Sequence, residues 1–150
     1  MDRLEQTYRA AAYRIDTAPA LTVRIGQASS GIATLHHVHQ CRDSLFISAC
    51  NPRSRRLRPA GNARRTRALR RVLDRLGYAW LPARGMDPDR QWPDEPGFWI
   101  AAMPLDEGLR LARRFGQNAI VRWSEDAVAQ LAWVPATAPG GTRRRRRTRG

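Results

Sequence analysis

The chain has 150 residues, of which 42% are hydrophobic, so its composition indicates a folded protein rather than an intrinsically disordered one. The charged residues 1–16 lack the apolar core of a signal peptide, and no segment approaches the roughly eighteen apolar residues of a membrane-spanning helix. The formal net charge is +14, and all 27 basic residues are arginine. Because no signal peptide is visible and the two cysteines, Cys41 and Cys50, lack CxxC spacing, we expect a cytoplasmic protein with reduced thiols.

The first 50 residues contain the patterns of one helix and two strands. Residues 2–13 have apolar side chains on one helical face, and Asp2 is placed to act as the N-cap. Residues 20–26 are rich in β-branched side chains and end in glycine, which is typical of a strand. Residues 45–50 form a nearly continuous apolar run, which predicts a strand that is buried on both faces.

A second helix is predicted from Asn62, which would cap it, to residue 76, with Gly77 as the terminating residue. Its apolar stripe consists of Leu69, Val72, Leu73 and Leu76. Residues 83–97 contain three prolines and are expected to form a loop. The remaining predicted elements are strands at 78–82, 98–103, 118–123 and 128–134 and a helix from Asp106 to Phe115 that Gly116 ends.

From residue 45 the predicted order is strand, helix, strand, strand, helix, strand, which is the order of the ferredoxin-like split βαβ unit. We therefore predict an α+β fold with this β-α-β-β-α-β core, an added N-terminal helix and strand, and a C-terminal hairpin strand. Right-handed crossovers would place both core helices on one face of the sheet. Residues 1–135 are expected to form a single globular domain, and residues 136–150 an arginine-rich disordered tail.

The stretch "FISACNPRSRRLRPAGNARR" is the first candidate site, because an apolar strand ends there in a polar turn. Asn51 and Ser54 could bind a small polar or anionic ligand together with the free backbone N–H groups of the helix that begins at Asn62. Arg64 and Arg65 would add positive charge. The structural alternative is that Asn51 and Ser54 satisfy backbone groups in the turn and that Asn62 only caps the helix.

The second candidate is the junction at Gln117 and Asn118, just before a predicted strand. Parallel neighbouring strands start at the same edge of a sheet, so Gln117, which precedes its strand, and Asn51, which ends its own, could lie at opposite edges. They would converge if the topology differs. The alternative role for these amides is bonding to loop carbonyls.

The pair Asp94 and Glu95 precedes a predicted buried strand, and adjacent side chains on an extended segment point to opposite faces. A buried Glu95 could act as a general acid or base with a raised pKa. The alternative, which we consider the better interpretation, is that Glu95 pairs with an arginine of residues 53–75.

The segment "HHVHQC" invites a metal-binding interpretation. If it is extended, His37, His39 and Cys41 share one face, but with His36 all the candidate ligands lie within residues 36–41 and no second cluster exists. We therefore expect a polar loop and no metal site, and the sequence identifies no cofactor. Cys50 has no nearby histidine to activate it, so packing is its expected role.

Arginine is concentrated in two places. Residues 53–75 hold ten arginines and one acidic residue, and the last eight residues hold six arginines and none, so the rest of the chain is almost neutral. On the predicted helix Arg64, Arg67, Arg70 and Arg71 could bind nucleic-acid phosphates, although no aromatic residue for base stacking accompanies them. A solvated helix face is the simpler alternative. A third possibility is docking of a partner protein on Trp80 and Trp92.

Four segments resemble an uncharacterised bacterial family, domain of unknown function 3293, and "YRAAAYRI" and "LTVRIG" fit it more loosely, so that the resemblance runs from about residue 8 to residue 134. The four segments are "LFISACNPRS", "GNARRTRALRRVL", "WPDEPGFWIAAM" and "LARRFGQNAIVRW". The resemblance implies a compact domain and no particular reaction. Its signature residues would be Asn51, Pro52, Ser54, Asn62, Glu95, Gln117 and Asn118. Because all but Pro52 are polar residues at segment ends, the resemblance favours a shared pocket. Cys50 occupies a position where the resemblance implies an aromatic residue.

Overall fold

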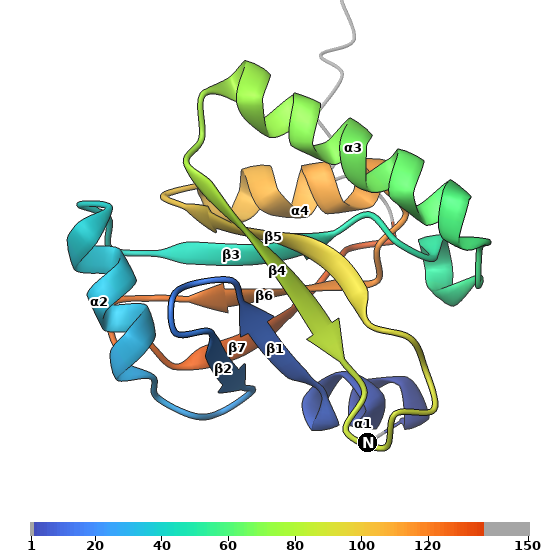
Figure 1. The fold of residues 1–150 in the computed structure, drawn as a ribbon, viewed down its shortest axis with the longest axis horizontal. Helices are drawn as coiled ribbons and strands as arrows, with labels where there is room; N and C mark the ends of the chain where they lie inside the picture. Colours follow the sequence, from blue (N-terminus) through green and yellow to red (C-terminus); the bar gives the residue numbers. More distant parts are fainter. Residues whose placement is uncertain (1, 137–150) are drawn as a thin grey trace, which may run out of the picture.

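A curled antiparallel sheet of seven strands, in the order β2-β1-β4-β5-β3-β6-β7, forms the body of the computed structural model, which describes residues 2–136 (Figure 1). The strands are β1 (Ala12–Ile15), β2 (Leu21–Arg24), β3 (Ser44–Ser48), β4 (Trp80–Met86), β5 (Glu95–Ala101), β6 (Ala119–Trp123) and β7 (Ala129–Trp133). The helices are α1 (Arg3–Ala10), α2 (Ser30–Val38), α3 (Pro59–Leu76) and α4 (Leu105–Arg114). This mixture of helices and strands agrees with the predicted α+β class. Apart from residue 136, the predicted tail lies outside the described residues.

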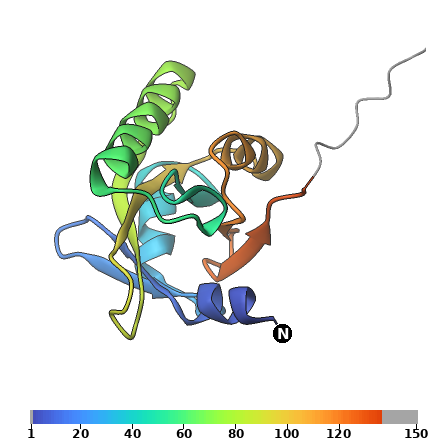
Figure 2. The ribbon, with the colours of Figure 1, turned by 90° about the vertical axis from the view of Figure 1, so that its right-hand side faces the viewer.

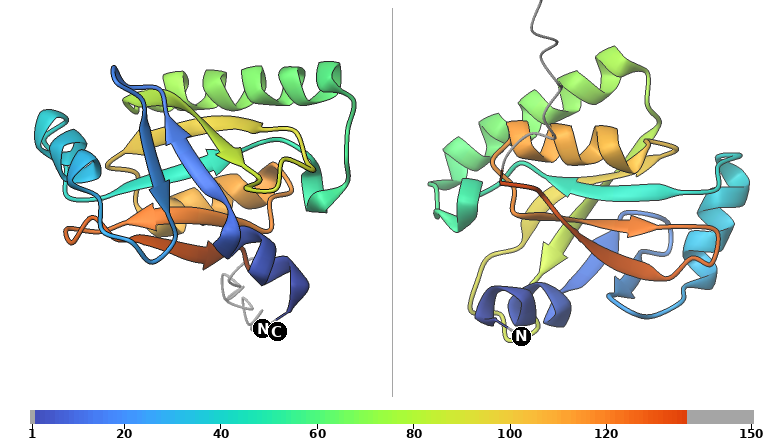
Figure 3. Two further views of the ribbon diagram at one scale, coloured as in Figure 1. Left: turned by 60° about the horizontal axis from the view of Figure 1, so that its bottom comes forward. Right: turned by 180° about the vertical axis from the view of Figure 1, so that it is seen from behind.

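The sheet separates two hydrophobic cores. The helices α3 and α4 lie on one side of it, as Figure 2 shows, and cover a core that includes Leu69, Leu73 and Leu111. On the other side the sheet curls around a second core, which contains Trp99 and Trp123 (Figure 3). Two isolated bridges, Ile25 with Ala129 and Ala28 with Val128, join the segment after β2 to the start of β7 and bring the sheet edges together.

Strand β3 lies between these cores and is buried on both faces, as its apolar run predicts. Leu45 and Ile47 pack toward α3 and α4, whereas Phe46 packs into the second core, because successive side chains of a strand alternate between its faces. No helix within residues 2–136 is long and apolar enough to cross a membrane.

The N-terminal helix is shorter than its pattern predicts. Asp2 caps it as expected, its side chain accepting a hydrogen bond from the Glu5 backbone N–H at 2.8 Å, but the helix ends at Ala10. The following residues form β1, because Tyr13 and Ile15 bury their side chains in the second core while the backbone pairs with β2 and β4. The gain from tertiary burial thus overrides the helical propensity of the alanines.

The prediction of a polar loop at residues 36–41 was largely wrong, because residues 30–38 form helix α2. Ser29 caps this helix by accepting a hydrogen bond from the Ile32 backbone N–H at 3.2 Å. Ile32, Leu35 and His36 form its buried face. The spacing of these three residues is the helical signal that the histidine cluster obscured.

Three further element boundaries differ from the prediction. Helix α3 begins at Pro59 rather than Asn62, since proline is well suited to the first turn of a helix, and Leu76 at its end is 51% exposed instead of buried. Helix α4 begins at Leu105, so Asp106 lies in its first turn and is not the cap. Strands β4 and β5 pair from Gly85 with Glu95 onward, which shortens the predicted loop to residues 87–94.

The relation of β3 to β6 decides where the candidate residues lie. The two strands are antiparallel neighbours, with Ser44 opposite Trp123 and Phe46 opposite Val121. The end of β3 therefore meets the beginning of β6. The assumption of parallel neighbours was wrong, and Asn51 and Gln117 come to the same edge of the sheet.

Candidate functional site

The chain makes a sharp turn directly after β3. Asn51, Arg53 and Ser54 have positive φ angles of 48°, 52° and 61°, a left-handed conformation that asparagine tolerates better than most residues. The Arg53 backbone N–H donates to the Gly116 carbonyl at 2.6 Å and ties this turn to the end of α4. Gly116 approaches Pro52 so closely that an added Cβ would lie 2.7 Å from the Pro52 Cβ.

Asn51 and Asn62 form a reciprocal pair. The Asn51 backbone N–H donates to Asn62 Oδ1 at 2.9 Å, and Asn62 Nδ2 donates to Asn51 Oδ1 at 2.8 Å. Asn51 Oδ1 also accepts from the Leu57 backbone N–H at 3.0 Å. The prediction that Asn62 caps α3 was therefore wrong. The helix begins three residues earlier, and the Asn62 side chain instead holds the turn through its hydrogen bonds with Asn51.

Arg65 and Gln117 bond mainly to backbone carbonyls. Arg65 Nε donates to the Ala49 carbonyl at 2.6 Å, and its guanidinium donates to the Phe115 carbonyl and lies 5.8 Å from the centre of the Phe115 ring. Gln117 Nε2 donates to the Cys50 carbonyl at 2.9 Å. The role predicted for Arg65, charge for an anionic ligand, is not the one these contacts indicate, since they fasten α3 and α4 to the end of β3.

Glu95 begins β5 next to Asn51. Its Oε1 accepts a hydrogen bond from Asn51 Nδ2 at 2.7 Å, and the side chain is half-buried. Burial raises the pKa of the Glu95 carboxyl, and the hydrogen bond from Asn51 opposes part of that rise. The expected pairing with an arginine was wrong: within residues 2–136 no Arg or His nitrogen lies within 4.0 Å of this carboxyl, whereas the neighbouring Asp94 pairs with Arg84 at 3.7 Å.

Two tyrosines, neither of them a candidate from the sequence, complete this end of the sheet. Burial raises the pKa of Tyr8, the negative charge of Glu95 raises it further, and the nearby polar side chains of Asn118 and Ser54 oppose the rise. The Tyr13 hydroxyl donates to the Tyr8 carbonyl at 3.4 Å. Tyr8 lies within the helix predicted for residues 2–13, where the pattern indicated only packing, and only the fold places it near Glu95.

Asn118 Nδ2 donates to Ser54 Oγ at 3.0 Å and so joins the start of β6 to the same turn. Three distant parts of the sequence thus meet around one turn, in a group that we call the Asn51 cluster: Asn51, Ser54, Asn62, Glu95, Gln117 and Asn118. Arg64, the other predicted ligand residue, is exposed on α3 and has no hydrogen bond to the cluster within the described residues.

The other sequence candidates have structural roles. Cys50 is 2% exposed, burial raises the pKa of its thiol, and Sγ contacts Thr66 Oγ1 at 3.7 Å, as expected of a packing residue. His36 Nε2 and Ser44 Oγ form a buried hydrogen bond of 2.7 Å. Both cysteines are free thiols, and residues 2–136 contain no group of three His, Cys, Asp or Glu side chains suited to a metal ion.

The two tryptophans considered for partner docking differ in exposure. Trp80 is half-buried, packs edge-on against Phe98 with ring centres 5.0 Å apart, and donates from Nε1 to Asp74 at 2.7 Å. It is therefore not the exposed anchor that was considered. Trp92 is 56% exposed, and the Arg56 guanidinium lies 5.7 Å from its ring centre.

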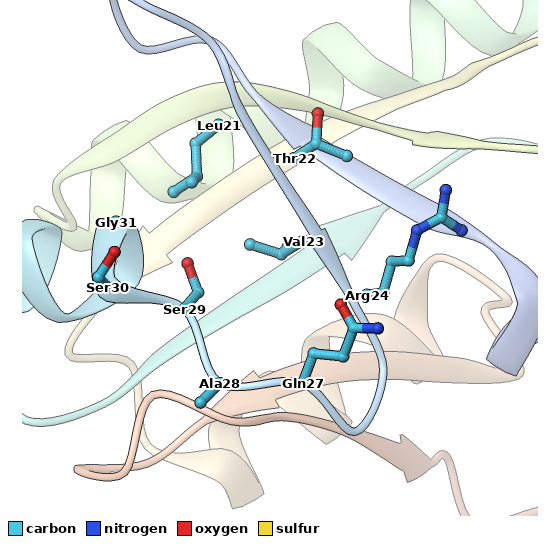
Figure 4. Close-up of a pocket in the computed structure, with 9 residues that line it drawn as sticks. All are labelled: Leu21, Thr22, Val23, Arg24, Gln27, Ala28, Ser29, Ser30 and Gly31. Carbon is cyan, nitrogen blue, oxygen red and sulfur yellow. The ribbon is translucent and has the colours of Figure 1, made fainter.

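Two depressions of the described surface lie away from the Asn51 cluster and include none of its residues. One, of about 270 Å³, lies between β2 and the start of α2 and is lined by residues such as Thr22, Arg24, Gln27 and Ser29 (Figure 4). Another lies between α3 and α4. The polar groups of the cluster meet at the turn after β3, outside both of these depressions.

Comparison with family models adds one finding. Residues 47–120 match the model of the family described as Protein of unknown function (DUF3293), which confirms the resemblance over the segment that contains every member of the Asn51 cluster. The wider extent proposed from the motifs stays a prediction. No curated protein and no solved structure matches the chain.

Proposed function

We propose that this chain, whose residues 47–120 belong to a family of unknown function, binds a small polar ligand where Glu95 meets Tyr8, Ser54 and Asn118. The proposal rests on the burial, the raised pKa and the hydrogen-bond partner of the Glu95 carboxyl. This is a half-buried carboxyl with a raised pKa, held at one oxygen by Asn51, without a cationic partner among the described residues. A carboxyl that costs stability in this way is more common at functional sites than elsewhere.

The chemistry of the surrounding groups favours a neutral or cationic ligand over an anionic one. The site offers a carboxyl, hydroxyls and one amide, whereas the guanidinium of Arg65 is occupied by backbone carbonyls. A ligand with a hydroxyl, amide or amine group would find both donors and acceptors here. The pKa of the Glu95 carboxyl is shifted toward neutral pH, which suits a group that takes up and releases protons. Glu95 is therefore the residue to test for acid–base chemistry.

A thermal-shift screen with amines, polyols, nucleosides and sugar phosphates tests this proposal. We expect at least one amine or polyol to raise the unfolding temperature of the parent protein, because a ligand that binds only the folded state stabilises it. Glu95→Gln should abolish the shift and the matched control Asp94→Asn should keep it, since Asp94 pairs with Arg84. A shift retained in Glu95→Gln would place the ligand elsewhere and refute the proposal.

A second candidate function is binding of nucleic-acid phosphates on the outer face of α3. Arg64, Arg67, Arg70 and Arg71 are exposed there, and none lies within 4.0 Å of a carboxylate of the described residues. Such unpaired guanidinium groups suit a polyanion. Fluorescence anisotropy with DNA and RNA oligomers should give affinities that fall steeply with salt, with a slope reduced in Arg67→Ser. Affinity that does not depend on salt would exclude this mode of binding.

We also propose that the four central strands and the helices α3 and α4 form a ferredoxin-like unit within a single domain. The strand order β6-β3-β5-β4, with all neighbours antiparallel, and the position of both helices over one core support this interpretation. In this view β1, β2 and β7 extend the unit at its two edges.

A further inference from the structure

The depression between α3 and α4 is separate from the Asn51 cluster and has a composition of its own. It has a volume of about 280 Å³ and lies where the last two turns of α3 face α4. Its apolar part consists of Val72, Leu76 and Leu111. Leu76 belongs to the stripe predicted to be buried, yet it is 51% exposed here, so the groove presents aliphatic surface to solvent.

Arginines surround this aliphatic surface. Arg75 comes from α3, and Arg110 and Arg114 come from α4. Arg110 pairs with Asp106 at 3.3 Å, but Arg75 and Arg114 have no carboxylate within 4.0 Å among residues 2–136. The one acidic residue of the lining, Glu107, is engaged by the Tyr78 hydroxyl, which donates to Oε2 at 2.6 Å. The groove therefore combines a hydrophobic floor with an excess of positive charge.

We propose that this groove binds an acidic amphipathic helix of a partner protein, with an aliphatic side chain of that helix packed against Leu76 and its carboxylates paired with Arg75 and Arg114. An amphipathic helix that lays its apolar face into a groove between two helices is a recurrent mode of recognition. The charges complement each other, and an aliphatic anchor surrounded by arginine pairs matches the usual anatomy of an interface.

The chemistry of the groove favours this occupant over two others. A nucleic acid would contribute phosphates for the arginines, but the groove has no aromatic side chain on which a base could stack. The chain's own last residues, "RRRRRTRG", carry the same charge as the rim and would be repelled. The proposal is independent of the ligand site at Glu95, since the two share no residue.

The test uses the full-length protein and a fluorescent acetylated peptide of about 15 Glu, Ala and Leu residues whose leucines lie on one helical face. A control peptide has the same composition with its leucines spread evenly around the helix, so that net charge is unchanged. Fluorescence anisotropy at about 0.15 M salt measures both affinities. The protein variants are Leu76→Ser and Arg114→Ser, with the matched controls Val38→Ser, at another exposed aliphatic residue, and Arg113→Ser, at an exposed arginine of α4 outside the groove.

We expect the patterned peptide to bind at least about five-fold more tightly than the control peptide. Leu76→Ser and Arg114→Ser should each weaken it by about five-fold or more, whereas Val38→Ser and Arg113→Ser should change it by less than about two-fold. Equal affinity for the two peptides would mean attraction by charge alone and would overturn the proposal, as would no binding at about 1 mM peptide. A DNA or RNA oligomer that binds more tightly than the patterned peptide and is insensitive to Leu76→Ser would assign the arginines to nucleic acid instead.

Discussion

Asn51 Nδ2 donates a hydrogen bond of 2.7 Å to Glu95 Oε1 and so joins two residues that are 44 positions apart in the sequence. The register of the sheet makes this contact possible. In the antiparallel pair β3 and β5, Ser48 lies opposite Gly97, so the chain after β3 and the chain at the start of β5 lie at the same edge. The asparagine thereby fixes the carboxyl that we propose as the functional group.

Replacing Asn51 should lower stability substantially. Asn51→Ala removes three side-chain hydrogen bonds and places alanine in a left-handed conformation, so we expect a loss of about 2–4 kcal/mol in the free energy of unfolding. The control Asn118→Ala removes one side-chain hydrogen bond and should cost about 1 kcal/mol. Urea denaturation with an unchanged m-value measures both. Equal, small losses would show that Asn51 does not hold the turn.

Gly116 should tolerate a side chain less well than Gly77. Both follow a helix with positive φ, 70° and 80°, so alanine at either position should cost about 1–2 kcal/mol from backbone conformation. A Cβ at Gly116 would also meet Pro52, whereas at Gly77 no atom lies within 4 Å. We expect Gly116→Ala to be less stable than Gly77→Ala by at least about 1 kcal/mol in the same denaturation assay. Identical losses of stability would mean that the turn at Pro52 shifts to accommodate the added methyl group without a measurable cost in free energy.

The raised pKa of Glu95 predicts a specific dependence of stability on pH. Because its folded-state pKa lies above the ordinary value of 4.5, the folded protein binds this proton more tightly than the unfolded chain does. The contribution of Glu95 to stability is therefore greatest at low pH and falls as pH rises from that value through the raised pKa. Glu95→Gln should lack this fall, so its stability relative to the parent should improve as pH rises.

Thermal unfolding of the parent and Glu95→Gln from about pH 4 to pH 8 measures this difference directly. Asp94→Asn serves as the control, because it alters no Glu95 contact and the side chains of the Asp94–Arg84 ion pair are 47% and 43% exposed. A relative stability of Glu95→Gln that declines with rising pH would indicate a lowered pKa and contradict the description of the site.

His36 should destabilise the folded protein in acid. Burial lowers its pKa from the ordinary value of 6.5, so the unfolded chain binds the proton more readily than the folded protein does. Stability should therefore fall as pH decreases below 6.5. His36→Gln should reduce the fall and the exposed neighbour His37→Gln should not, as measured by denaturant midpoints across this range. Parallel pH profiles for all three proteins would refute the prediction.

Local sequence patterns predicted those elements whose burial agrees with their periodicity. The apolar run at 45–50 specified a strand buried on both faces, and Asp2 and Gly77 marked a helix start and a helix end because capping depends on a few neighbouring residues. Predictions failed where tertiary contacts competed with local preference. Residues 12–15 form a strand because they pair with β2 and β4. Asn62 lies inside α3 rather than at its start, and its side chain bonds with Asn51.

The sequence by itself therefore determined which residues were candidates for the site: polar side chains at segment ends, among them Asn51, Glu95 and Gln117. Only the tertiary structure decided which of them meet and what each does. The antiparallel pairing of β3 with β5 and β6 brings three distant segments to one edge, where most of the amides bond to backbone and to one another. The environment of Glu95 and Tyr8, on which the proposed ligand site rests, was not visible in the sequence, because hydrogen bonding and burial depend on neighbours that lie far away in the chain.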